Sequence, residues 1–214
     1  MNATFAALWP KGSEKEMMDA GSDLWNNLKT SDVHVNWPLG PILAIKTKQG
    51  VFDNSPLLSF LQDLIAGYDQ FYRKITVSAL NTNTGDIEYF TDDNVPKDEF
   101  YKAAFSSTCV VGAWPNYHWL QPDGSIKSYS DNYMIANTDA QSTINRCLEV
   151  VDDPSKITID VLILGDAKDF EVYDHHEEDA KRKDKQSWKS LGNFLRARDI
   201  SYQYGNYNSI FHTI

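Results

Sequence analysis

The chain has 214 residues, of which 42% are hydrophobic, and its formal net charge is −10. This surplus of acidic residues argues against a nucleic-acid-binding protein, because the neutralisation of phosphates needs clustered Lys and Arg. No window approaches the roughly 20 apolar residues that cross a bilayer, and no signal-peptide pattern is present, so the sequence as given predicts a soluble protein of unknown compartment.

Two helices are predicted at the N-terminal end. Residues Met1 to Leu8 have the composition of a helix, which Pro10 and Gly12 end. A second helix is expected to begin at Ser13, because Ser13 and Glu16 have the spacing of a capping box. Apolar residues follow this start at helical spacing: Met17, Ala20, Leu24 and Leu28.

A third helix and a hairpin are predicted next, after residues 33–47, whose aromatic and proline-containing pattern indicates neither helix nor strand. The Ser-Pro pair at 55–56 favours a helix start and Gly67 favours its end. Residues 73–90 alternate in strand fashion on both sides of the turn-rich residues 81–85, which predicts a β-hairpin. One face of its first strand carries Ile75, Val77 and Ala79.

The C-terminal third predicts a helix, a strand and a further helix. Thr138 and Gln141 have capping-box spacing, and an apolar stripe follows them. Residues 157–164 are nearly all apolar, as in a strand covered on both faces. The region from Lys181 to Arg198 has the pattern of a basic amphipathic helix. Strands that alternate with long helices imply an α/β fold with a layered sheet flanked by helices, and we expect one domain over residues 1–214.

Four segments between residues 50 and 150 resemble, in order and spacing, motifs of the patatin-like phospholipases, a family of lipid acyl hydrolases. The first matches Gly-aromatic-Asp-x-x-Pro-Leu, the second a strand with its Thr-Gly turn, and the third a Ser-rich stretch that ends in aromatic-Pro, with Val111 where proline is usual. The fourth resembles the family's Asp-Gly-Gly or Asp-Gly-Ala motif. These segments are Gly50–Leu57, Arg73–Ala79 with Asn83–Gly85, Ser106–Pro115 and Tyr129–Thr138.

The resemblance implies a Ser-Asp dyad that hydrolyses acyl esters of phospholipids or neutral glycerides, with no cofactor or metal and with contact to a membrane surface. It assigns Asp131 as the proton acceptor. Neither Gly-x-Ser-x-Gly nor Gly-x-Gly-x-x-Gly occurs in the chain, so no nucleophile is identified. Residues 1–3 resemble the stretch just behind the family's nucleophile elbow, so the resemblance implies an N-terminally truncated domain that lacks its first strands and exposes a sheet edge.

Two departures from the motif affect Asp131. The family has glycine after the Asp, whereas this chain has Asn132, which tolerates a left-handed backbone, and then Tyr133, whose large ring can narrow or block a pocket. Without the resemblance, Asp131 would be read as a turn residue that hydrogen-bonds its own backbone. A catalytically inactive relative that binds lipid or a partner protein therefore stays open as an alternative.

Other reactive side chains have simpler interpretations. Cys109 and Cys147 are too few for a disulfide framework or a four-thiolate zinc site, and an inert core thiol is favoured for Cys109 because no base adjoins it. The same lack of a base favours structural roles for Ser106 and Ser107. The aromatic residues Trp114, Tyr117 and Trp119 can line an acyl pocket or belong to an ordinary core and rim.

Two charged segments near the C-terminus also have simpler interpretations. His175 and His176 are adjacent, whereas metal ligands on a helix usually stand three or four residues apart, so a solvated helix start at Asp174 is favoured over a metal site. The basic residues 181–189 can contact anionic lipid headgroups, but the acidic residues among them favour a solvated helix face.

Overall fold

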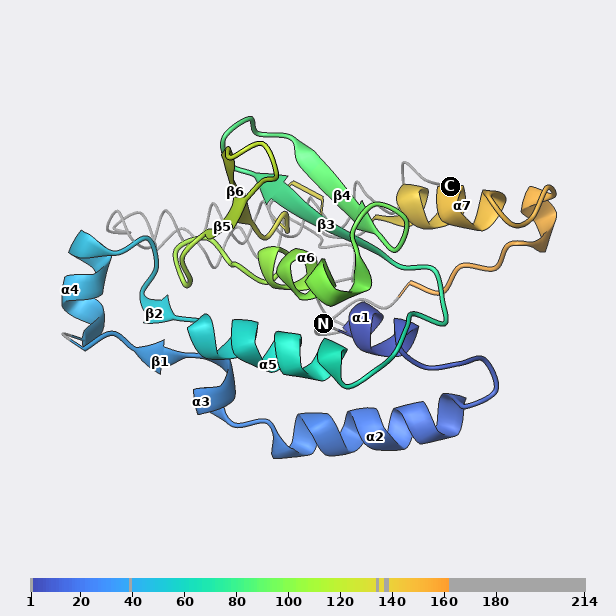
Figure 1. The fold of residues 1–214 in the computed structure, drawn as a ribbon, viewed down its shortest axis with the longest axis horizontal. Helices are drawn as coiled ribbons and strands as arrows, with labels where there is room; N and C mark the ends of the chain where they lie inside the picture. The colour runs from blue at the N-terminus through green and yellow to red at the C-terminus, as the bar shows by residue number, and fades with distance from the viewer. Residues whose placement is uncertain (1, 39, 134, 137–138, 162–214) are drawn as a thin grey trace, which may run out of the picture. The chain divides into compact units, whose positions relative to one another are not determined.

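The computed structural model describes residues 2–38, 40–133, 135–136 and 139–161 (Figure 1). Contacts divide the chain into two compact units, Met1–Asn132 and Tyr133–Ile214, and each is described by itself. The first unit contains these helices and strands in order: α1 (Asn2–Ala7), α2 (Glu14–Asn27), α3 (Thr30–Val33), β1 (Val35–Asn36), α4 (Gly40–Thr47), β2 (Phe52–Asp53), α5 (Ser55–Ala66), β3 (Thr76–Asn81), β4 (Ile87–Thr91), the 3-10 helix η1 (Lys97–Glu99), α6 (Phe100–Ser106), β5 (Tyr117–Leu120) and β6 (Ile126–Ser130).

The main sheet of the first unit has four antiparallel strands in the order β4-β3-β6-β5. The predicted hairpin over residues 73–90 is confirmed, with Leu80 opposite Ile87 and Thr76 opposite Thr91. β1 and β2 form a separate two-stranded antiparallel sheet. With its seven α-helices, the described part of the chain has the mixed α/β class that the sequence predicted.

Two buried clusters lie among these elements. The larger one joins α1, the end of α5, β3, β4, α6 and β6, and it includes Ile75 and Ala79, as the strand alternation predicted. The smaller one lies between α5 and α6, which run beside each other in Figure 1. Its buried members are Leu57, Leu61, Ala104, Phe105 and Cys109.

A half-buried carboxylate crosses the strands of the main sheet. Glu88 of β4 accepts hydrogen bonds from the Tyr129 hydroxyl at 2.6 Å and from Asn81 Nδ2 at 2.7 Å, and it pairs with Lys127 Nζ at 3.0 Å. Burial raises the pKa of Glu88, but these three donors stabilise the ionised form and lower it overall. The four residues therefore tie β4, β3 and β6 together through their side chains.

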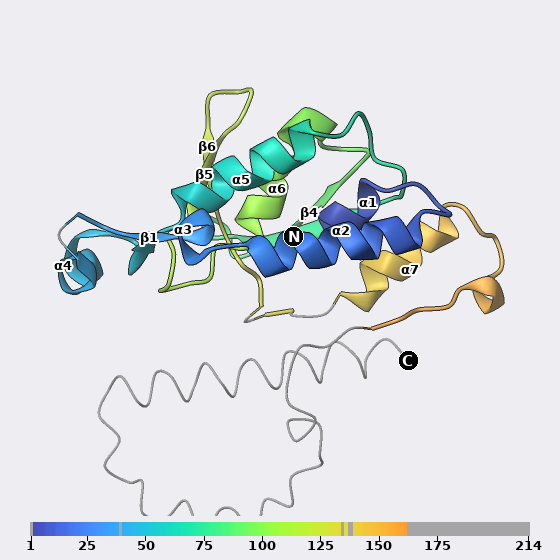
Figure 2. The same ribbon diagram turned by 90° about the horizontal axis from the view of Figure 1, so that it is seen from below.

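Both N-terminal helices are confirmed, but the predicted capping box at Ser13 and Glu16 is wrong. The Ser13 hydroxyl donates instead to the Pro10 carbonyl, at 3.1 Å, and makes no cap hydrogen bond to the helix. The carboxylate that accepts a preceding backbone amide is Glu14, which binds Gly12 N and pairs with Arg73 at 2.8 Å. These contacts lower the pKa of Glu14 to about 2 and fix the start of α2, which lies beside α1 in Figure 2.

The predicted third helix is confirmed as α5, with its cap one residue earlier than expected. Asn54, rather than Ser55, stands at the N-cap, and Gly67 follows the helix end as predicted. The Asn54 side chain makes no cap hydrogen bond, while Asp53 Oδ1 accepts the Ser55 amide at 2.9 Å. The Asn54 side chain instead donates a hydrogen bond to the Cys109 sulfur.

In the second unit, the helix predicted after residue 138 is present as α7 (Ala140–Leu148), followed by the 3-10 helix η2 (Pro154–Lys156). Asp139 is the N-cap residue and accepts the Ser142 amide at 3.0 Å, whereas Thr138 of the predicted capping box with Gln141 lies outside the described residues. Residues 157–161 form no strand, and Val161 is exposed. These apolar residues have no partner strand in the described part of the chain, and an apolar run alone does not make a strand. The rest of that strand and the helix expected from Lys181 to Arg198 lie outside the described residues.

Candidate functional site

Asp131 follows the last residue of β6 and is half-buried. Its backbone amide donates to the Cys109 carbonyl at 2.9 Å. The residues on both sides, Ser130 and Asn132, are buried, and the Ser130 hydroxyl has no hydrogen-bond partner among the described residues.

Cys109 is fully buried next to Asp131. Burial raises the pKa of its thiol to about 12, and the negative charge of Asp131 acts in the same direction, while a hydrogen bond from Asn54 Nδ2 at 3.6 Å opposes both. The thiol also donates to the Phe105 carbonyl at 3.3 Å. The predicted core position of Cys109 is confirmed, and its burial and raised pKa favour a protonated, unreactive thiol at neutral pH.

All four sequence segments of the resemblance meet around Asp131. Asn54 belongs to the first segment and contacts Cys109 of the third, whose carbonyl binds the Asp131 amide of the fourth. Asn132 Nδ2 donates to the Ser78 hydroxyl of the second segment at 3.0 Å. Contacts between residues 55 positions apart (Asn54 and Cys109), 54 apart (Ser78 and Asn132) and 22 apart (Cys109 and Asp131) therefore hold the turn that carries the carboxylate.

A second contact joins the first and third segments at their ends. Gly50 forms a parallel bridge with Gly112, and the amides of Val51 and Phe52 donate to the carbonyls of Gly112 and Ala113 at 3.3 and 3.0 Å. The glycine at position 50 is required, because a Cβ there would lie 2.3 Å from the Trp114 carbonyl carbon.

The turn after Asp131 does not use a left-handed backbone. Among the described residues, positive φ angles occur at glycines alone, so Asn132 lies outside the conformation that the family's glycine permits. Tyr133 is half-buried. The Asn132 side chain instead bonds the Ser78 hydroxyl and so attaches this turn to β3.

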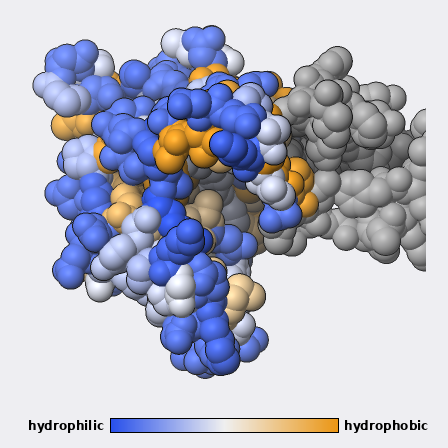
Figure 3. All heavy atoms as spheres, turned by 90° about the vertical axis from the view of Figure 1, so that its right-hand side faces the viewer, coloured by the Kyte–Doolittle hydropathy of each residue, from blue (hydrophilic) through white to orange (hydrophobic). Residues whose placement is uncertain are grey.

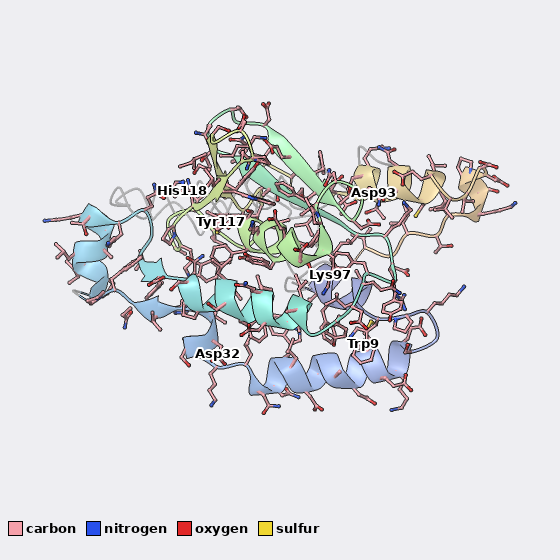
Figure 4. The ribbon with its side chains drawn as sticks, viewed as in Figure 1. Trp9, Asp32, Asp93, Lys97, Tyr117 and His118 are labelled. Carbon is pink, nitrogen blue, oxygen red and sulfur yellow. The ribbon has the colours of Figure 1, made fainter. Side chains whose placement is uncertain are left out.

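The remaining predicted residues of the first unit have packing roles. The Ser106 hydroxyl is buried and donates to the Lys102 carbonyl at 2.8 Å, and Tyr117 of β5 packs edge-on against Phe105 with ring centroids 5.4 Å apart. Trp119 stacks near Phe90 at the same distance. Figure 4 shows Tyr117 on the side of β5 that faces α6 and the exposed His118 turned away from it. Trp114, Tyr117 and Trp119 are all half-buried, as rim aromatics are.

Sequence reasoning missed Asn54 and Ser78 as neighbours of the candidate base. Asn54 precedes a helix start, where a capping role is the usual expectation. Ser78 occupies the face of β3 opposite to Ile75, Val77 and Ala79, so the strand alternation indicated its direction but not its partner.

No cluster of three His, Cys, Asp or Glu side chains that could hold a metal ion occurs among the residues that the structure describes. His175, His176 and the basic residues 181–189 lie outside them. None of the described helices has both the length and the apolar character needed to span a bilayer.

The chain matches no protein-family model and no curated protein sequence.

Proposed function

We propose that this chain is part of a patatin-like lipid acyl hydrolase domain in which Asp131 is the proton acceptor. The observation that carries the proposal is the meeting of four separate motif segments around Asp131, through Asn54, Cys109 and Ser78. Motifs that resemble a family only by chance have no reason to converge on the residue that the family uses as its base.

The position of α1 supports the same proposal. Ala7 and Leu8, at the end of α1, share a buried cluster with Tyr129, which stands two residues before Asp131. In the proposed enzyme, the nucleophilic Ser precedes this helix, so α1 and β6 are the two elements that must be held together. The buried cluster that contains Ala7, Leu8 and Tyr129 holds α1 and β6 together.

In the proposed reaction, the Asp131 carboxylate accepts the proton of the Ser hydroxyl as the oxygen attacks the acyl carbonyl carbon. The alcohol part of the lipid leaves, and water then hydrolyses the acyl-enzyme to release the fatty acid. Backbone amides of a glycine-rich loop stabilise the oxyanion. Asp131 alone of these groups is in the sequence, so the 214-residue chain by itself is expected to show no Ser-dependent esterase activity.

The test extends the chain by the coding sequence directly upstream of Met1, if that sequence encodes Gly-x-Ser-x-Gly in frame. The extended protein should hydrolyse a fluorogenic phospholipid or diacylglycerol ester, and Asp131→Asn should lower the rate by about 10²- to 10⁴-fold, the usual contribution of a general base. Asp123→Asn, which alters an exposed turn carboxylate, is the matched control and should retain activity. Equal rates for the Asp131→Asn and wild-type proteins would refute the proposal.

A catalytically inactive relative that binds lipid or a partner protein is the second candidate. The bulky Asn132 and Tyr133 and the absence of a left-handed turn favour it. A hollow of about 170 Å³ in the first unit is lined by residues from Trp37 to Lys48 and by none of the residues around Asp131. If the upstream sequence lacks the Ser motif and the chain binds lipid without hydrolysing it, this candidate replaces the enzyme.

A further inference from the structure

Helix α4 exposes most of its apolar side chains. Ala44 is its single buried residue, whereas Ile42 is 81% exposed, Ile45 is 69% exposed and Leu43 is 38% exposed. In Figures 1 and 2, α4 lies at one end of the first unit, beyond β1 and β2. In the view of Figure 3 the described residues are mostly hydrophilic, and hydrophobic ones form small groups.

The sequence around α4 is also basic within an acidic protein. No Asp or Glu occurs from Val33 to Phe52, although the chain has 30 acidic residues. Lys46 lies in the last turn of α4, and Lys48 directly follows the helix. Lys48 Nζ lies 4.8 Å from the centre of the Trp37 ring. We define the α4 surface as Trp37, Ile42, Leu43, Ile45, Lys46 and Lys48.

We propose that the α4 surface binds the bilayer of an anionic lipid membrane. The aliphatic side chains would enter the boundary between headgroups and acyl chains, while the two lysines meet lipid phosphates and Trp37 lies at the interface. This inference rests on the proposed function, because it would bring the site near Asp131 to the surface that holds acyl esters.

Size and charge favour a membrane over a second copy of the chain. A helix of eight residues presents three aliphatic side chains. These are too few to bury the roughly 1,200 Å² of total surface that a stable protein interface buries. A symmetric dimer through this surface would also bring the lysines of both copies together, Lys46 and Lys48. A bilayer needs no shape complementarity, and its negative headgroups attract an acid-free segment with two lysines.

The experiment measures flotation of the 214-residue chain with vesicles of phosphatidylcholine, with and without about 30% phosphatidylserine. The wild-type protein should float with the anionic vesicles and at least tenfold less with the neutral ones. The pair Ile42→Ser and Ile45→Ser should lower binding at least tenfold, and Lys46→Glu with Lys48→Glu should do the same for anionic vesicles.

A matched control comes from the β5–β6 hairpin. Leu120 and Ile126 are 65% and 60% exposed and lie opposite each other, so Leu120→Ser with Ile126→Ser removes a similar aliphatic pair elsewhere. This variant should bind like the wild type. The inference would be overturned if the Ile42 and Ile45 variant bound vesicles as well as the wild type, or if the wild type did not bind at all. It would also be overturned if light scattering showed a wild-type dimer that the same substitutions convert to a monomer.

The proposed function and this inference fail separately. Asp131→Asn leaves the α4 surface intact, so it should bind vesicles like the wild type whether or not Asp131 is a catalytic base. Hydrolysis of a dispersed ester that depends on Asp131, without vesicle binding by the α4 surface, would remove the inference and leave the proposed function. Vesicle binding without any Asp131-dependent hydrolysis in the extended protein would do the reverse.

Discussion

Gly50 and Trp114 lie so close that a methyl group on Gly50 would be 2.3 Å from the Trp114 carbonyl carbon and 2.6 Å from its α-carbon. Sixty-four positions of sequence separate the two residues, and their contact joins the segment between α4 and β2 to the loop between α6 and β5. Since the neighbouring atoms belong to the backbone, no side-chain rotation can relieve the overlap.

Gly50→Ala should therefore destabilise the first unit by about 1–3 kcal/mol or more, as overpacking usually does. Urea unfolding followed by tryptophan fluorescence measures the change. Gly67→Ala is the matched control, because a Cβ there meets carbonyl oxygens at an ordinary distance of 3.5 Å and its φ is −69°. The control should shift stability by about 0.5 kcal/mol or less, and equal urea midpoints for the two variants would contradict the close contact.

Glu88→Gln should lower stability at neutral pH by about 1–2 kcal/mol, since a charged acceptor of three hydrogen bonds is lost from a partly exposed site. The pKa of Glu88 is lowered in the folded state from its ordinary value of 4.5, so its contribution to stability is present above that pH and disappears as pH falls through the lowered folded value. The gap between wild type and variant should thus shrink as the pH falls below 4.5. Glu16→Gln, at an exposed position on α2, should leave stability at neutral pH unchanged.

Alkylation should distinguish the two cysteines of the folded chain. With a thiol pKa raised to about 12 and no exposed surface, Cys109 should resist iodoacetamide at pH 8, while the partly exposed Cys147 reacts. Peptide mass spectrometry identifies the modified residue. In urea both thiols should be modified, which controls for the reagent, and equally fast labelling of Cys109 in the native protein would show that the packing around Asp131 is open.

The bond between Asn132 and Ser78 should be measurable by a double-mutant cycle. Asn132→Ala and Ser78→Ala each remove one partner of a 3.0 Å hydrogen bond, and we expect a coupling free energy of about 1 kcal/mol in urea unfolding. Ser59→Ala, at an exposed position of α5, replaces Ser78→Ala in the control cycle and should give no coupling. Additive effects of Asn132→Ala and Ser78→Ala would mean that this side-chain bond does not hold the turn after Asp131.

Local sequence patterns predicted the elements whose ends and faces depend on neighbouring residues. The apolar spacing after Ser55 and the glycine at 67 were enough to define α5, and the alternation of Ile75, Val77 and Ala79 was enough to define the buried face of β3. These signals fail where a side chain has a distant partner. Asn54 stands at a cap position, but its side-chain amide donates to the Cys109 sulfur. The apolar residues 157–161 have the composition of a strand without forming one.

The sequence by itself determined the α/β class, several of the helices and the hairpin, because periodicity and turn preferences act over short distances along the chain, and the family resemblance made Asp131 a candidate. The tertiary structure alone decided that β6 lies between β3 and β5, that Asn54, Cys109 and Ser78 hold the turn around Asp131, and that α4 leaves Ile42 and Ile45 in solvent. Those outcomes depend on which distant segments compete successfully for the same buried volume and hydrogen-bond partners, and no local pattern carries that information.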